Sequence, residues 1–156
     1  MDINRMHDCT KLFIFDLDGT LADINHRLHY VRQSPVHWGK FQEACVNDKP
    51  IYWVIDLFNI CRKHGEVIIL SGRNDIVREK TVEWLSKEDI RYDYLLMRKD
   101  KDYRPDQVIK LEMLDDFLRD KGYEVQFIVD DRQRVVDMWR ENGYHVLQCN
   151  TWEEKS

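Results

Sequence analysis

Short apolar runs rich in β-branched and aromatic residues alternate along the chain with longer segments of helical pattern. Five of these runs, each bounded by Gly, Asp or Asn, predict strands over residues 11–17, 66–70, 92–97, 124–129 and 144–149. Helices are predicted between them over residues 74–87, 105–121 and 132–142. Strands that alternate with helices are typical of a parallel sheet. We therefore predict an α/β fold, an open parallel sheet of about five strands flanked by helices.

Residues 23–65 interrupt this alternation, because the segment is much longer than one crossover helix needs. Ser34 before Pro35 and Asp48 before Pro50 predict helix starts, so two or three helices are expected here. The segment is interpreted either as a small helical cap over a site or as a crossover packed on the sheet. Six of its apolar residues fall at helical spacing and are expected to be core residues: Trp38, Phe41, Ile51, Val54, Ile55 and Phe58.

The composition is that of one globular domain over residues 1–156, with 43% hydrophobic residues and a formal net charge of −5. This charge argues against a broad basic surface for duplex nucleic acid but allows a small phosphate pocket. No apolar run is long enough for a signal core or a membrane span. The four cysteines are widely spaced and form no Cys-x-x-Cys pair. We expect a reduced, cytoplasmic protein with no membrane contact.

Acidic residues follow two of the predicted strands. The apolar run of the first strand, residues 12–15, leads directly into Asp16-Leu17-Asp18-Gly19-Thr20, and Asp130-Asp131 ends the fourth strand. Open parallel sheets bind ligands beyond the carboxyl ends of their strands. If these two strands are neighbours, four carboxylates converge. Each like-charge pair at about 4 Å costs about 4 kcal/mol at an effective dielectric of about 20, so a cation is required. Oxygen ligands alone suit Mg²⁺. A helix-loop-helix calcium site is not supported, since its loop would need Gly where Leu21 stands.

Two further strand ends carry groups that can bind an anion. Ser71-Gly72-Arg73 ends the second strand before a predicted helix, which presents a hydroxyl and backbone N–H groups. Lys110, early in the helix after the third strand, could reach a phosphate oxygen and the nearby carboxylates. Taken singly, these residues could be a helix cap and an exposed ion pair of Lys110 with Asp106. Their joint order at strand ends favours phosphoryl transfer through an aspartate nucleophile.

Three other features of the sequence concern metal, phosphate or nucleotide binding. His26 and His29 have the spacing of a helix-face pair but lack a third metal ligand, so we expect them to be structural. The loop of residues 98–104 carries four basic and two acidic side chains. It is either a solvated loop or a grip on a substrate phosphate or a nucleic-acid end. No Gly-x-x-x-x-Gly-Lys-Ser/Thr motif occurs, so no ATP site is expected in this chain.

The motifs Asp16-Leu17-Asp18-Gly19-Thr20, Ser71, Lys110 and Asp130-Asp131 resemble, in this order, the four motifs of the haloacid dehalogenase superfamily of phosphohydrolases. Residues 15–27, 69–73, 98–110 and 128–140 also resemble the phosphatase domain of phage-type polynucleotide kinase-phosphatases. The resemblance covers nearly the whole chain except the helical segment, which is longer here. It includes no kinase half, so it does not imply phosphorylation of 5′ ends.

The resemblance implies a role for each matching residue. Asp16 is the implied nucleophile and Asp18 the general acid/base, oriented by Thr20. Asp16, the backbone carbonyl of Asp18 and Asp130 are implied to ligate Mg²⁺, with Asp131 supporting them. Ser71 and Lys110 are implied to bind the phosphoryl group during catalysis. The remaining candidates for substrate binding or scaffolding are Thr20, Arg27, Gly72, Arg73 and Arg98.

Three functions follow as alternatives. The first is a Mg²⁺-dependent phosphomonoesterase that removes the 3′-phosphate from DNA or RNA ends, or phosphate from a nucleotide. The second is a phosphatase for small metabolites or nucleoside 5′-monophosphates, favoured by the acidic charge and the long helical segment. The third is a non-catalytic phosphate-binding module, although receiver-like modules order their acidic residues differently. The sequence leaves the oligomeric state open.

Overall fold

A five-stranded parallel sheet forms the centre of this computed structural model, which describes residues 9–151. The strands are β1 (Thr10–Phe15), β4 (Glu66–Asn74), β5 (Tyr94–Arg98), β6 (Tyr123–Asp130) and β7 (Val146–Gln148). Their order is β5-β4-β1-β6-β7, and every neighbouring pair is parallel. The predicted parallel α/β sheet is confirmed, and each predicted strand overlaps one of these five.

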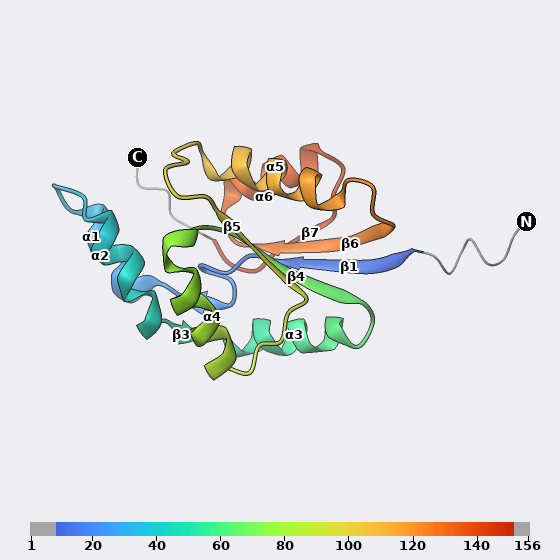
Figure 1. Ribbon diagram of the computed structural model, residues 1–156, viewed down its shortest axis with the longest axis horizontal. Helices are drawn as coiled ribbons and strands as arrows, with labels where there is room; N and C mark the ends of the chain where they lie inside the picture. Colours follow the sequence, from blue (N-terminus) through green and yellow to red (C-terminus); the bar gives the residue numbers. More distant parts are fainter. Residues whose placement is uncertain (1–8, 152–156) are drawn as a thin grey trace, which may run out of the picture.

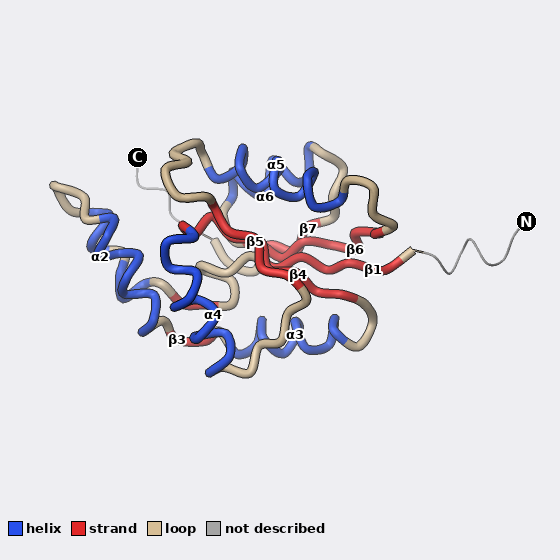
Figure 2. Tube along the Cα trace, viewed as in Figure 1, coloured by secondary structure: helices blue, strands red, loops and turns tan. Residues whose placement is uncertain are grey.

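Helices cover both faces of the sheet (Figures 1 and 2). On one face lie α3 (Tyr52–Arg62) and α4 (Arg78–Lys87), and on the other lie α5 (Asp106–Leu118) and α6 (Gln133–Glu141). Asn74 caps the short 3-10 helix that precedes α4, because its side-chain oxygen accepts a hydrogen bond from the Ile76 N–H at 2.9 Å. Gly143 follows α6 with a φ of 86°, a left-handed conformation that glycine adopts without strain.

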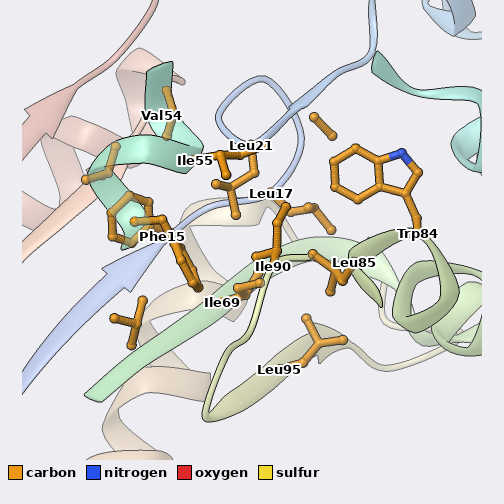
Figure 3. Close-up of a cluster of buried hydrophobic side chains, with 14 of the residues drawn as sticks. Phe15, Leu17, Leu21, Val54, Ile55, Ile69, Trp84, Leu85, Ile90 and Leu95 are labelled. Carbon is orange, nitrogen blue, oxygen red and sulfur yellow. The ribbon is translucent and has the colours of Figure 1, made fainter. Parts of the chain in front are cut away.

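The central strands are buried on both faces, which explains their continuous apolar runs. Along β1, Phe13 and Phe15 join the core beneath α3 and α4, shown in Figure 3, whereas Leu12 and Ile14 join the core beneath α5 and α6. Successive side chains of a strand point to opposite faces, so a shift of one residue would exchange the two sets. This packing fixes the register of β1 and hence the place of Asp16, the next residue.

The segment between β1 and β4 contains both a crossover helix and a projecting helical hairpin. Its regular elements are β2 (Ala22–Asp23), α1 (His29–Arg32), α2 (Trp38–Glu43), β3 (Lys49–Pro50) and α3. The pair β2-β3 is antiparallel and was not predicted. Helix α3 packs on the sheet, while α1 and α2 lie beyond the carboxyl ends of the strands, at the left of Figure 1.

Several expectations for this segment were wrong in detail. Helix α2 begins at Trp38 and α3 at Tyr52, so neither Ser34 nor Asp48 starts a helix. Asp48 is instead followed by β3. Trp38 is 61% exposed rather than part of the core, because α2 lies outside the layers of the sheet and its covering helices.

The predicted core is confirmed within α3, where Val54, Ile55 and Phe58 are buried, whereas Phe41 and Ile51 are half-buried. None of the helices within residues 9–151 combines the length and the apolar character needed to cross a bilayer.

Candidate active site

Three carboxylates meet where the central strands end. Strand β1 lies between β4 and β6, so Asp16 comes next to Asp130 and Asp131 at the same edge of the sheet. All three are buried, and one oxygen from each lies within 4.8 Å of those of the other two. Within the described part of the chain, this is the cluster whose residue types and spacing suit a metal ion. The first and fourth strand ends converge as predicted, but three carboxylates meet there rather than four, because Asp18 is held by two arginines outside the cluster.

Lys110 supplies the positive charge inside this cluster. Its ammonium donates hydrogen bonds to Asp16 Oδ1 at 2.9 Å and to Asp130 Oδ2 at 3.0 Å. The side chain reaches the acids from α5 and is buried rather than an exposed partner of Asp106. Burial lowers the pKa of Lys110, but the charges of Asp130 and Asp16 outweigh this effect and raise the pKa well above its usual range.

One ammonium does not compensate three buried carboxylates. Burial, and then the charge of Asp130, raises the pKa of Asp16 to about 6. Burial, and then the charge of Asp16, raises the pKa of Asp131 to about 10. Lys110 opposes both shifts. Carboxylate oxygens are the ligands that Mg²⁺ prefers. The oxygen donors of the site and its excess of negative charge both fit this ion.

Thr20 contacts Asp16, whereas the resemblance implied that it orients Asp18. The turn after β1 folds back on Leu17, whose carbonyl oxygen accepts hydrogen bonds from the backbone N–H groups of Thr20 at 3.2 Å and Leu21 at 2.9 Å. This turn brings Thr20 Oγ1 within 3.0 Å of Asp16 Oδ2, to which it donates a hydrogen bond. Because Lys110 binds the other oxygen, both oxygens of Asp16 are held in place.

Asp18 belongs to a separate ionic group beside the acid cluster. Its Oδ1 accepts a hydrogen bond from Arg27 Nη2 at 2.8 Å and one from Arg73 Nη2. Burial raises the pKa of Asp18, but the charges of Arg73 and Arg27 outweigh it and hold this pKa below its usual range. The side chain of Asp18 is 21% exposed, so a ligand can approach it.

The end of β4 forms a tight crossing with the start of α5. Ser71 is buried, and its Oγ accepts a hydrogen bond from the Arg73 backbone N–H at 3.0 Å. A Cβ atom on Gly72 would collide with the carboxylate of Asp106, so that side chain would have to move. Asp106 in turn binds Arg98 and accepts a hydrogen bond from Arg132 Nη1 at 2.8 Å. The predicted site residues Ser71 and Gly72 therefore lie near the end of β4, next to the ion pairs of Asp106.

Arg98 contacts the chain's own backbone. Its Nε donates to the Gly72 carbonyl oxygen at 2.8 Å, and its Nη1 donates to the carbonyl oxygens of Asp102 at 2.9 Å and Arg104 at 2.6 Å. Of the two roles expected for Arg98, these contacts correspond to scaffolding. They attach the loop after β5 to the end of β4.

Asp48 is a site residue that the sequence analysis missed. Its buried carboxylate accepts hydrogen bonds from Arg27 Nε at 2.8 Å and from Arg73 Nη2 at 3.1 Å. His26 Nε2 lies 2.6 Å from Asp48 Oδ1, which gives His26 a structural contact. No local pattern marks Asp48, because its two arginine partners are 21 and 25 residues away in the sequence.

A cavity of about 420 Å³ lies elsewhere and contains none of these acids. Its lining is formed by α5, Arg119 and Met138 of α6. It therefore does not belong to the site at the strand ends.

Comparison with known proteins identifies the family. A family model described as "Polynucleotide kinase PNKP phosphatase domain" matches residues 10–153. A protein of Autographa californica nuclear polyhedrosis virus, named "Putative bifunctional polynucleotide kinase/RNA ligase", is 32% identical over 134 residues. This match covers 84% of the present chain and 18% of the viral protein.

Solved structures agree with this result. A chain from the Pnkp1/Rnl/Hen1 RNA repair complex superposes with a TM-score of 0.81 and 37% identity, covering 93% of this chain and 44% of that one. A haloacid dehalogenase-like protein of Streptococcus pneumoniae has a TM-score of 0.58 at 17% identity, which shows the fold alone. The chain thus spans less than half the length of these first two relatives. Since the family model matches almost every described residue, the chain belongs to the PNKP phosphatase-domain family of haloacid dehalogenase-type phosphatases.

Proposed function

We propose that this chain is a Mg²⁺-dependent phosphomonoesterase that removes the 3′-phosphate from nucleic-acid ends or nucleotides through an aspartyl-phosphate intermediate. The observation that carries the proposal is the buried carboxylate of Asp16, whose Oδ2 is bound by Thr20 and whose Oδ1 is bound by Lys110. An ordered carboxylate at the end of a central strand, surrounded by groups that bind cations and anions, is arranged as a nucleophile toward phosphorus.

Mg²⁺ would be held by Asp16, Asp130 and the backbone carbonyl of Asp18, with Asp131 supporting them. The raised pKa values of Asp16 and Asp131 support this assignment, because burial and then a neighbouring carboxylate disfavour the ionised forms, which a cation would stabilise. When bound, the ion would supply positive charge that stabilises the phosphoryl oxygens.

The chain's own residues would perform the bond changes. An oxygen of Asp16 forms a bond to phosphorus while the bond from phosphorus to the sugar oxygen breaks, and Asp18 gives a proton to that oxygen. Water then attacks the aspartyl phosphate, Asp18 accepts its proton, and inorganic phosphate leaves. Ser71 and Lys110 would contact the transferring phosphoryl group. The anionic substrate counteracts the charges of Arg27 and Arg73, which favours protonation of Asp18 in the complex.

The family and its relatives support a polynucleotide substrate. The matched family model is that of a polynucleotide kinase phosphatase domain, and the 37% identical chain comes from an RNA repair complex. A phosphatase for nucleoside 5′-monophosphates or small metabolites is the second candidate. It is favoured by the α1–α2 hairpin beyond the strand ends, where a cap could close over a small substrate, and by the net charge of −5.

A substrate panel tests the proposal. The purified chain is assayed for phosphate release from oligonucleotides with a 3′- or a 5′-phosphate, from 3′- and 5′-mononucleotides and from an aryl phosphate, with Mg²⁺ or with EDTA. We expect the wild-type chain to release phosphate from the 3′-phosphorylated substrates in Mg²⁺ but not in EDTA. We expect Asp16→Asn to release none. Denaturing the enzyme with acid during turnover should trap phosphate on the wild-type chain. Persistent activity of Asp16→Asn, or a preference of a hundredfold or more for 5′-mononucleotides, would contradict it.

A further inference from the structure

A buried carboxylate outside the motifs of the site, that of Asp48, has a fixed position. Its side chain has 0% exposure. Its backbone N–H donates to the Cys45 carbonyl oxygen at 3.1 Å, and its own carbonyl oxygen accepts a hydrogen bond from Trp84 Nε1 at 2.9 Å. Both main-chain groups of Asp48 are therefore bound, and Trp84 attaches the residue to α4.

Asp48 and Asp18 bind the same two guanidinium groups. Arg27 Nη2 lies 2.9 Å from Asp48 Oδ2 and 2.8 Å from Asp18 Oδ1. Arg73 Nη2 lies 3.1 Å from Asp48 Oδ2 and also binds Asp18 Oδ1. Each arginine is held again at Nη1, Arg27 by a carbonyl oxygen at 3.2 Å and Arg73 by a threonine hydroxyl at 3.0 Å. Asp48 thus fixes the groups that hold Asp18.

A purely structural role does not account well for this network. Buried ion pairs contribute little net stability compared with apolar side chains of similar volume, because each charge must be desolvated. The network also ends on Asp18, whose side chain remains partly accessible. We propose, on the basis of the phosphatase function above, that Asp48 is a positioning residue: it holds Arg27 and Arg73 so that the Asp18 carboxyl group faces the leaving oxygen of the substrate.

This role predicts an effect that depends on the leaving group. A sugar alkoxide must be protonated as it departs, whereas a nitrophenolate departs without a proton. Loss of Asp48 should therefore slow the first step for a 3′-nucleotide but hardly for p-nitrophenyl phosphate. The quantity to compare is kcat/KM, because it reports the steps up to the aspartyl phosphate and not its later hydrolysis.

The test compares both substrates for Asp48→Asn. We expect kcat/KM for the 3′-nucleotide to fall by about tenfold or more and kcat/KM for p-nitrophenyl phosphate to fall by less than about threefold, as for a misplaced general acid. Asp18→Asn should show the same pattern more strongly. Asp93→Asn is the matched control, since Asp93 binds the Val67 backbone N–H at 2.8 Å away from the site. It should leave both values unchanged.

Equal losses on the two substrates, or no loss, would overturn the proposal. If Asp48→Asn does not fold, His26→Ala replaces it, because His26 contacts Asp48 Oδ1 without touching Asp18. For His26→Ala we expect kcat/KM to fall a fewfold for the 3′-nucleotide and to stay unchanged for p-nitrophenyl phosphate. An unchanged kcat/KM for the 3′-nucleotide contradicts the role of Asp48. If wild-type chain and Asp16→Asn are equally inactive on both substrates, the proposed function itself fails. If Asp18→Asn shows the leaving-group effect and the Asp48 variant does not, the inference about Asp48 fails alone.

An independent observation concerns the loop of residues 99–104, between β5 and α5. Arg98 holds the carbonyl oxygens on both sides of Tyr103, at Asp102 and Arg104. Asn74 Nδ2 donates to Asp100 Oδ1 at 3.0 Å, at the other end of the loop. The loop is therefore attached at several points to the end of β4, and it lies at the same end of the sheet as the α1–α2 hairpin, where the strands finish (Figure 1).

The side chains presented by this loop are nevertheless exposed. Tyr103 is 88% exposed, the highest value among the exposed large hydrophobic residues of the described chain, and Lys99 and Lys101 are exposed beside it. An aromatic ring next to ammonium groups suits single-stranded nucleic acid, because bases stack on the ring while phosphates attract the cations. We infer, again resting on the proposed function, that the loop binds the strand carrying the phosphate and that Tyr103 stacks on a base.

Substitution of Tyr103 tests this inference. Tyr103→Ala should lower kcat/KM for a 3′-phosphorylated oligonucleotide by about tenfold, the order expected for one lost stacking contact, and leave the aryl phosphate unaffected. Tyr103→Trp should retain activity on both. Tyr52→Ala is the matched control, since Tyr52 on α3 is 69% exposed and lies outside the loop. An unchanged oligonucleotide rate, or equal losses on both substrates, contradicts the inference. Activity on the aryl phosphate with none on oligonucleotides removes both the loop inference and the polynucleotide substrate, but not the phosphatase activity.

Discussion

The ammonium of Lys110 lies 2.9 Å from Oδ1 of Asp16, although 94 residues separate them in the sequence. The same ammonium lies 3.0 Å from Asp130 Oδ2, so it bridges the ends of two neighbouring strands. Because the groups are buried, removing this cation leaves uncompensated negative charge in a region of low dielectric. Lys110 therefore orders the site, and its removal is expected to destabilise the fold.

Replacement of Lys110 by methionine should destabilise the chain. Breaking one side of a buried ion pair costs about 3–5 kcal/mol, so the free energy of unfolding should fall by about that amount at neutral pH. The decrease should be smaller at about pH 5, where more of the carboxylates are protonated. Urea unfolding at both pH values measures it, with the exposed Lys80→Met as the control. An equal decrease at both pH values would contradict the electrostatic explanation.

Thr20 should affect kcat/KM through its hydroxyl group and not through the shape of its side chain. Thr20→Val removes the hydrogen bond to Asp16 Oδ2, and a net contribution of about 1 kcal/mol corresponds to about fivefold in kcat/KM. Thr20→Ser keeps the hydroxyl and should remain close to wild type. Steady-state kinetics on an aryl phosphate distinguishes the two, and a Val variant with wild-type rates would show that the hydrogen bond does not orient the nucleophile.

The metal-free chain should lose stability as the pH rises. The folded-state pKa values of about 6 for Asp16 and about 10 for Asp131 both lie above the usual value of about 4. The folded state therefore binds more protons than the unfolded state over this interval, and the free energy of unfolding falls with rising pH. The contribution is fully present below about pH 4 and is lost as the pH passes about 6 and then about 10. Thermal unfolding in EDTA from pH 5 to pH 9 measures this, and a rising Tm would be the wrong sign.

Asp131→Asn should distinguish the cost of burying Asp131 in the metal-free chain from its contribution to metal binding. With a folded-state pKa of about 10, Asp131 must take up a proton when the metal-free chain folds at about pH 8. Asparagine avoids this cost, so in EDTA at about pH 8 we expect the Tm of the variant to equal or exceed that of the wild type. Mg²⁺ should raise the wild-type Tm, because a ligand that binds only the folded state stabilises it. The increase should be smaller for the variant. Scanning calorimetry with and without Mg²⁺ gives both values, and an equal increase for the two proteins would exclude Asp131 from the metal site.

Gly72→Ala should disturb the end of β4. The added Cβ would collide with the carboxylate of Asp106 and move it away from Arg98 and Arg132. We expect a loss of stability and activity together, since Ser71 precedes the displaced residue. Gly39→Ala is the control because its Cβ meets nothing within 4 Å and Gly39 lies in α2, where alanine is favoured by about 1 kcal/mol. A Gly72→Ala variant as stable as Gly39→Ala would contradict the close approach.

The pattern of apolar and polar residues along the chain was sufficient to predict the sheet and the edge of the sheet at which the candidate site residues lie. Phe13 and Phe15 alternate with Leu12 and Ile14 because β1 is covered on both faces, and such runs are visible without a structure. Asp16 follows β1 directly, and Asp130 is the last residue of β6. Carboxyl ends of parallel strands meet at one edge, so their proximity could be predicted from position alone, and the family match agrees.

Tertiary structure decided which atoms meet at that edge. A tight turn brings Thr20 to Asp16 and not to Asp18, and the placement of α2 outside the layers leaves Trp38 exposed. Asp48 binds Arg73 across 25 residues of sequence. Local periodicity reports which face of an element is buried, whereas a hydrogen-bond partner depends on how distant segments pack and on turn geometry, which no short-range pattern encodes.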